Sequence, residues 1–118
     1  MDSPEKTPQI VVSQGSSMTR AQVYWLIRNS VYPPCKLEPR SIRKRHRLDK
    51  DLGFIGNSVR LLAAKTNEAL SLAQPHRLTG SEVVLFQTVD DHVRAVEDKL
   101  SASGRLEGTN NTGPRRSA

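Results

Sequence analysis

The feature of this sequence with the clearest chemical consequence is a run of basic side chains in residues 40–50. Six of its eleven residues are Lys or Arg and one is acidic; the six are Arg40, Arg43, Lys44, Arg45, Arg47 and Lys50. Side chains of this kind bind nucleic-acid phosphate, because each contact releases counterions. The whole chain carries a formal net charge of +6, which also favours an anionic partner. The run therefore predicts DNA contacts through phosphates, which orient a protein without reading base sequence.

Other interpretations of the basic run stay open. A solvated, charged start of a helix has the same composition, and a membrane surface or an acidic protein would attract the same charges. Ile42 and Leu48 are the only apolar residues of the run, so it lacks the apolar face that a membrane-bound helix needs. We expect a DNA partner and no membrane partner.

The residue types that carry most enzyme chemistry are poorly spaced here. His46, His76 and His92 have no metal-ligand spacing with one another or with Cys35, the single cysteine. His92 lies beside an apolar stripe, which is typical of a packing residue at the edge of a core. We therefore expect a protein that is not an enzyme, with no metal and no cofactor.

Acidic neighbours do not change this expectation. Adjacent carboxylates such as Asp90 and Asp91 diverge on a helix, and Asp90 with Arg94 has the spacing of an i,i+4 ion pair. No run of apolar residues reaches the roughly 20 needed to cross a bilayer, and the N-terminus lacks the apolar core of a secretory signal. These features predict a cytoplasmic protein.

The elements that position the basic run follow from composition and periodicity. The chain has 118 residues, and its ends are polar and rich in small residues, so we expect unstructured tails. The predicted organisation is a tail (1–8), a strand and helix segment (9–32), a linker (33–39), a basic helical hairpin (40–101) and a second tail (102–118). The short β-branched stretch at 9–12 is the possible strand.

Two helix starts are marked by capping boxes, Thr19 with Gln22 and Thr79 with Glu82. Apolar residues then repeat at spacings of three and four in two stripes. The first stripe is Leu48, Leu52, Ile55, Val59, Leu62, Thr66, Ala69 and Ala73; the second is Phe86, Val89, Val93, Val96 and Leu100. The fold class is therefore mostly α, with an antiparallel helical hairpin of about 41–73 and 81–101 preceded by a short helix.

Three features of the hairpin bear on its packing. Gly53 and Gly56 interrupt the first stripe and indicate either a break or a close approach by another element. A two-helix hairpin buries too little apolar surface to be stable alone, so we expect a homo-oligomer with coiled-coil character. Phe54 and Leu61 lie off the stripe and offer a second apolar surface for such contacts.

Residues 55–67, Ile-Gly-Asn-Ser-Val-Arg-Leu-Leu-Ala-Ala-Lys-Thr-Asn, resemble the signature of bacterial mobilisation proteins of the MobC type. Ile55, Gly56, Asn57, Ala63 and Asn67 match that signature outright, and Val59, Leu62 and Lys65 match in kind. Positions 58, 60, 61 and 66 depart from it. Proteins of this family are accessory factors of the relaxosome of conjugative and mobilisable plasmids.

The resemblance implies a DNA-binding accessory protein that assists a relaxase at a plasmid transfer origin. It also implies a motif face directed at the relaxase or at neighbouring DNA, formed by Gly56, Asn57, Arg60, Ala63, Lys65 and Asn67. Related relaxosome proteins often begin with a ribbon-helix-helix module, for which residues 9–31 have room for the ribbon and one helix. Two alternatives remain: a helical adaptor or coiled-coil partner protein, and a small ribbon-helix-helix-like transcriptional regulator.

Overall fold

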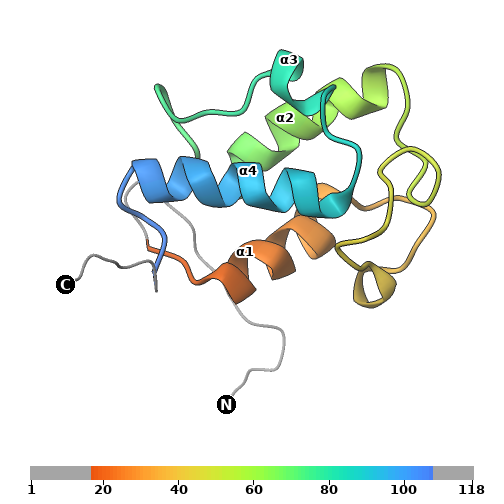
Figure 1. Cartoon of the computed structure of the whole chain (residues 1–118), viewed down its shortest axis with the longest axis horizontal. Coiled ribbons are helices and arrows are strands. Elements are labelled where there is room, and N and C mark those ends of the chain that lie inside the picture. The colour runs from red at the N-terminus through yellow and green to blue at the C-terminus, as the bar shows by residue number, and fades with distance from the viewer. Residues whose placement is uncertain (1–16, 108–118) are drawn as a thin grey trace.

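The computed structural model describes residues 17–107, and within this range the chain is mostly helical, as the sequence predicted. The helices in chain order are α1 (Arg20–Leu26), α2 (Asn57–Ala69), α3 (Gly80–Val83) and α4 (Val89–Ala102). A π-helical segment, η1 (Ile27–Val31), continues α1, and a 3-10 turn, η2 (Pro39–Ser41), opens the basic run. In Figure 1, α4 runs between α1 and α2, and α3 lies beside α2. The possible strand at 9–12 lies outside the described residues.

Local capping chemistry fixes where three of these helices begin. Both predicted capping boxes are confirmed: Thr19 caps α1 and Thr79 caps α3, each in reciprocal hydrogen bonds with the residue three positions on. A third box, Thr88 with Asp91, starts α4. In each case the hydroxyl and the side chain at the third helical position satisfy backbone N–H groups that a helix start would otherwise leave unpaired.

The predicted hairpin of two long helices is wrong in its details. The first helix was expected to begin near residue 41, but α2 begins at Asn57. Gly53 and Gly56 have φ values of +90° and +58°. These positive values are incompatible with a right-handed helix that runs through residues 53–56, so α2 starts only after them. The second helix, expected over 81–101, is divided into α3 and α4, because the chain leaves the helix after Val83 and starts again at the Thr88 cap.

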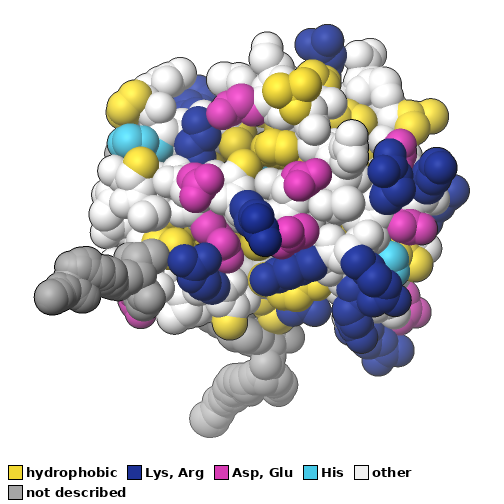
Figure 2. All heavy atoms as spheres, in the orientation of Figure 1, with side chains coloured by type: hydrophobic (Ala, Val, Ile, Leu, Met, Phe, Trp, Pro, Cys, Tyr) yellow, Lys and Arg dark blue, Asp and Glu magenta, His cyan; other side chains and the backbone are white. Residues whose placement is uncertain are grey.

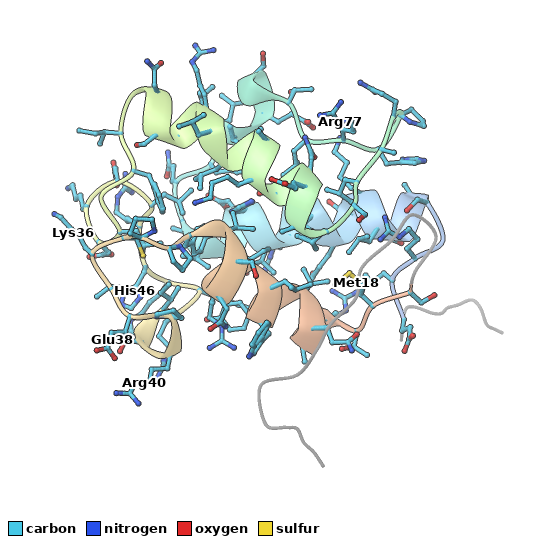
Figure 3. The ribbon with its side chains drawn as sticks, turned by 180° about the vertical axis from the view of Figure 1, so that it is seen from behind. Met18, Lys36, Glu38, Arg40, His46 and Arg77 are labelled. Atoms are coloured by element: carbon cyan, nitrogen blue, oxygen red, sulfur yellow. The ribbon has the colours of Figure 1, made fainter. Side chains whose placement is uncertain are left out.

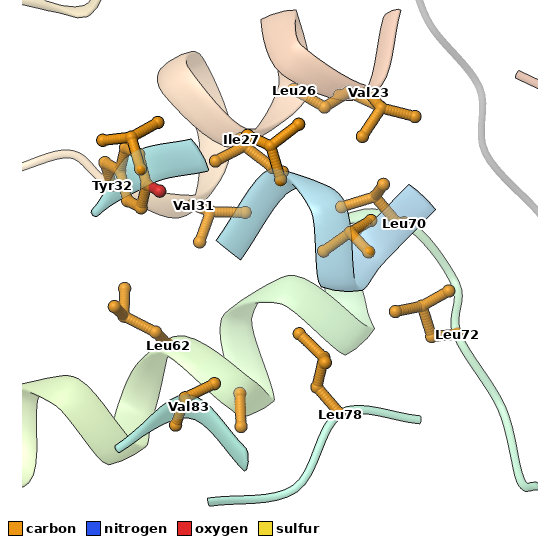
Figure 4. Packing of buried hydrophobic residues seen from close by; sticks show 14 of the residues in the cluster. Val23, Leu26, Ile27, Val31, Tyr32, Leu62, Leu70, Leu72, Leu78 and Val83 are labelled. Atoms are coloured by element: carbon orange, nitrogen blue, oxygen red, sulfur yellow. The ribbon is translucent and has the colours of Figure 1, made fainter. Parts of the chain in front are cut away.

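The core is built by η1, α2 and α4 together with the chain between η2 and α2. Figure 4 shows Ile27 and Val31 facing side chains of the α2 and α3 region such as Leu62 and Val83. Leu48 and Leu52 are also buried, although they lie in turns rather than in a helix. The apolar spacing of three and four therefore marked mostly buried or half-buried residues, with Ile55 (69% exposed) as the exception, but it did not mark their secondary structure; the described residues form no coiled coil.

The second apolar surface was predicted half correctly. Leu61 is exposed, but Phe54 is buried and its ring centroid lies 5.6 Å from that of Tyr32. Because α1, η1 and the 42–54 segment supply core residues, the single chain buries most of the apolar stripe residues that a hairpin would have left open. The argument that led us to expect an oligomer therefore no longer applies, and the oligomer stays a prediction.

The chain after α4 packs back onto the fold as far as Glu107, where the sequence had suggested a tail from residue 102. Met18 donates to the Arg105 carbonyl at 2.8 Å, and Glu107 donates to the Met18 carbonyl at 2.7 Å. The Arg105 guanidinium donates to the carbonyls of Leu70 and Ser71 at the end of α2, each at 2.9 Å. Among residues 17–107, no helix is long and apolar enough to cross a membrane.

Candidate nucleic-acid interface

The basic residues 40–50, called the basic loop from here on, follow η2 as a series of turns. The backbone of this loop is hydrogen-bonded to the start of α4: Leu48 donates to Gln87 at 3.0 Å, Val89 donates to His46 at 2.9 Å, and Asp90 donates to Lys44 at 2.9 Å. These bonds join the loop to α4 in one short antiparallel pairing. The backbone of the loop is therefore a fixed platform that needs little ordering before the side chains bind.

Contacts within the loop and from α1 support the same platform. His46 Nδ1 accepts from the Arg43 amide at 2.9 Å, so the ring bridges a turn of the loop. The Tyr24 hydroxyl of α1 donates to the Ile42 carbonyl at 2.8 Å. Figure 3 shows Lys36, Arg40 and His46 gathered at one end of the molecule, away from Arg77.

The six predicted DNA-binding residues divide into two groups. Arg40 pairs with Glu38 at 3.0 Å, and Arg47 holds Asp49 through two hydrogen bonds of 3.0 and 3.2 Å. The Arg47 guanidinium lowers the pKa of Asp49, so this carboxylate is ionised at neutral pH. The other four are exposed and have no carboxylate within ion-pair distance among the described residues: Arg43, Lys44, Arg45 and Lys50. Figure 2 shows Lys and Arg side chains crowded over this part of the surface.

One basic residue of this surface was missed by the sequence analysis. Arg28 of η1 stacks on the Tyr24 ring, with its guanidinium carbon 4.3 Å from the ring centroid. Lys44 Nζ lies 5.4 Å from the same centroid. Because both cations lie over the Tyr24 ring, Arg28 is close to Lys44 of the basic loop, although the two are 16 positions apart in sequence. We call Arg28, Arg43, Lys44, Arg45 and Lys50 the basic surface.

The predicted motif face is not one surface. Ala63 and Asn67 are buried, and the Asn67 amide both accepts from the Leu78 N–H at 2.8 Å and donates to the Leu78 carbonyl at 2.9 Å. Lys65 donates to the Pro33 carbonyl at 2.9 Å. Gly56, Asn57 and Arg60 remain exposed at the start of α2. The assignment of Asn67 to an outward face was wrong, because the seam of α2 is wider than a two-position heptad stripe and includes this asparagine.

The sequence analysis also missed a buried polar cluster formed by Tyr32, His92 and Thr66, called the histidine cluster below. His92 Nδ1 lies 2.9 Å from the Tyr32 hydroxyl, and Nε2 lies 3.0 Å from Thr66 Oγ1. The Thr66 hydroxyl donates to the Leu62 carbonyl, so Nε2 must be the protonated ring nitrogen and Nδ1 accepts from Tyr32. His92 is a core residue rather than an edge residue.

The surroundings keep the histidine ring neutral. His92 has no exposed surface, and the Phe86 ring stacks on it with a centroid separation of 5.5 Å. Burial lowers the pKa of His92 from its ordinary 6.5 to about 3. Burial likewise raises the pKa of Tyr32. Both groups are therefore uncharged at neutral pH, and their hydrogen bonds connect η1, α4 and α2.

The remaining candidate groups have simple local roles. Arg94 pairs with Asp90 at 2.9 Å, which confirms the predicted i,i+4 ion pair. Cys35 is half-buried, and its thiol donates to the Leu37 carbonyl at 3.2 Å. Asp91 accepts from the amides of Gln87 and Thr88, and these hydrogen bonds lower its pKa. Among residues 17–107, no group of three His, Cys, Asp or Glu side chains is placed to hold a metal ion.

Comparison with known proteins adds no family to this description. The chain matches no protein-family model, no curated protein and no solved structure.

Proposed function

We propose that this chain binds DNA through the basic surface, and that it does so as a relaxosome accessory protein at a plasmid transfer origin. The observation that carries the DNA-binding part is the fixed basic loop. Its four exposed cations, which have no carboxylate partner within residues 17–107, project from a backbone that is hydrogen-bonded to α4. Charges held this way favour a phosphate backbone, because the platform loses little conformational entropy on binding.

The proposed contacts are to phosphates rather than to bases. The basic surface lies on turns and on the side of η1, so no long helix of the described chain presents these cations to a major groove. Tyr24 is stacked against Arg28 and Lys44 and donates its hydroxyl to Ile42, so its ring is already engaged. Phosphate contacts of this kind position a protein on DNA with little sequence preference.

The more specific part of the proposal rests on the resemblance of residues 55–67 to the MobC signature. Of the predicted motif face, Gly56, Asn57 and Arg60 are exposed and remain candidates for contact with a relaxase. Ala63, Lys65 and Asn67 have structural contacts that account for them. Alanine replacement of Asn57 and Arg60 should reduce relaxase nicking without changing DNA affinity; unchanged nicking would contradict this assignment.

The experiment that tests DNA binding compares two double variants with the same loss of charge. Lys44→Ser/Arg45→Ser removes two cations of the basic surface, and Arg60→Ser/Arg77→Ser removes two exposed cations elsewhere. Each protein is titrated onto labelled origin duplex and onto random duplex at several salt concentrations. We expect the first variant to lower the slope of log affinity against log salt by about two, and the second to leave the slope unchanged.

A transcriptional regulator that uses an N-terminal ribbon needs a different truncation from the one the sequence suggests. Removing residues 1–32 would delete Val23, Ile27 and Val31, which are fully buried, and would unfold the domain. Removing residues 1–16 leaves every described residue in place. The proposal predicts that most DNA affinity survives this truncation, whereas a ribbon-based regulator would lose sequence-specific binding.

A further inference from the structure

A groove with a mixed polar and apolar lining, beside the basic loop, is a second candidate surface. Its floor is made by the buried Leu48 and Phe54, and its sides by Ile55 and Val59 before and within α2, and by Val84 and Phe86 after α3. The groove has a volume of about 290 Å³, at the lower end of the roughly 300–1,000 Å³ of most small-molecule sites. It has room for one or two large side chains of a partner.

The rim of this groove holds two of the four large apolar side chains that the described residues expose, and Leu85 follows one of them in sequence. Ile55 is 69% exposed, Val84 is 45% exposed, and the neighbouring Leu85 is 78% exposed. Figure 2 shows hydrophobic side chains at the surface over the end of the molecule where Figure 1 places α2 and α3. Exposed apolar residues gathered around a groove are typical of an interaction site, whereas single ones are ordinary.

Charge defines the partner. Arg47 and Asp49 of the basic loop also line the groove, so the groove and the loop share a wall. Arg47 and Asp49 pair with each other, but the stretch 36–50 as a whole carries seven Lys and Arg against two acids, so residues flanking an anchor in the groove would lie beside a segment of net positive charge. A second copy of this chain would bring the same positive charge to the contact, which is unfavourable at short range.

We propose that this groove binds an acidic segment of a partner protein, which inserts one or two large apolar side chains and places carboxylates over the basic loop. The apolar anchors supply most of the affinity, since buried anchors dominate protein interfaces. The carboxylates supply orientation and a faster association rate. This inference goes beyond the DNA contacts and does not depend on them.

The test uses a labelled amphipathic helical peptide with a leucine stripe flanked by glutamates. Its matched probes have the glutamates replaced by lysines or the leucines replaced by serines. Ile55→Ser/Val84→Ser changes two rim residues, and Leu61→Ser is the control, because Leu61 is 60% exposed on α2 but does not line the groove. Fluorescence anisotropy measures affinity, and circular dichroism checks that each variant is folded.

We expect the glutamate peptide to bind about tenfold more tightly than the lysine or serine peptide, and Ile55→Ser/Val84→Ser to weaken it about tenfold. Leu61→Ser should leave its affinity unchanged. Equal binding by the two variants would overturn the proposal. If the unmodified chain self-associates and Ile55→Ser/Val84→Ser does not, the groove belongs to a second copy of the chain. If the chain binds phosphatidylserine vesicles but no peptide, the groove belongs to a lipid surface. Either result overturns the proposal. The DNA affinity of Ile55→Ser/Val84→Ser should equal that of the unmodified chain. A failure of the groove proposal can therefore be told apart from a failure of the proposed DNA binding.

Discussion

The histidine cluster and the basic surface are both rich in hydrogen-bonding groups, but they use them differently. Tyr32, His92 and Thr66 direct their polar side-chain atoms to one another or to the Leu62 carbonyl, and no solvent reaches the histidine. Lys44 and Arg45 belong to a loop whose backbone is hydrogen-bonded to the start of α4, and both side chains are exposed. The difference separates polar residues that specify the fold from polar residues available to a ligand.

The largest expected effect comes from emptying the interior cluster. His92→Ala removes a fully buried ring and leaves the Tyr32 hydroxyl without its acceptor. We expect a loss of about 3–5 kcal/mol in the free energy of unfolding, from the cavity and the unpaired donor together. Urea denaturation followed by circular dichroism measures it.

His76→Ala is the control for this variant, because His76 is only half-buried and lies in the loop after α2. It should change the stability by less than about 0.5 kcal/mol. A His92→Ala protein as stable as the His76→Ala protein would show that the histidine cluster does not hold the three elements together.

Acid should destabilise the fold through the same histidine. The folded-state pKa of His92 is about 3, against 6.5 for an ordinary histidine. Between these two pH values the unfolded chain is protonated at His92 and the folded chain is not. Stability is therefore fully present above pH 6.5 and falls as the pH is lowered from 6.5 towards 3. The expected slope approaches about 1.4 kcal/mol per pH unit.

The interval from pH 6.5 to 5 isolates this effect, because the carboxylates with lowered pKa, such as Asp91, stay ionised there. Urea midpoints measured across this interval should decline for the unmodified chain. His92→Phe should remove most of the decline. A flat profile in the unmodified chain would contradict the neutral buried ring.

A smaller effect separates the two assignments of Asn67. Asn67→Ala leaves the Leu78 N–H and carbonyl without their buried partner, so we expect a loss of about 1–3 kcal/mol in stability. DNA affinity of the folded variant should be unchanged. Asn57→Ala, at the exposed start of α2, is the control and should leave stability within about 0.5 kcal/mol. Lost binding with unchanged stability would restore Asn67 to a functional face.

The sequence predicted what depends on near neighbours. The capping boxes at Thr19 and Thr79 involve residues three positions apart, so their chemistry is visible in the chain itself. The mostly helical class and most of the buried apolar positions were also predictable from periodicity, although Ile55 of the first stripe is exposed. Gly53 and Gly56 indicated either a helix break or a close approach by another element, and their positive φ values show the break.

The sequence could not predict contacts between distant segments. The histidine cluster joins residues 32, 66 and 92, and no local spacing indicates that these three meet. The place of Arg28 beside Lys44 depends on Tyr24 lying between them, which is likewise a tertiary fact. The basic residues of the candidate site were named from composition, but their division into paired and unpaired cations required the fold.

The smallest expected effect lies within the basic loop and sharpens this division. Arg45 is exposed and pairs with no carboxylate of the part of the chain that the structure describes, whereas Arg47 is held by Asp49. Arg45→Gln should lower the salt slope of DNA binding by about one, as expected for one lost phosphate contact. Arg47→Gln should change it by less, and salt-titrated anisotropy distinguishes the two. Equal losses would show that the Asp49 pair opens on binding.

The measurement that tests the central claim most directly is the salt dependence of duplex DNA binding by the unmodified chain. Four or five phosphate contacts from the basic surface predict a slope of log affinity against log salt of about −4. A slope of that size, reduced by Lys44→Ser/Arg45→Ser and not by Arg60→Ser/Arg77→Ser, is the result expected here. No binding at about 50 mM salt, where phosphate contacts are strong, would contradict the assignment of the basic surface to nucleic acid.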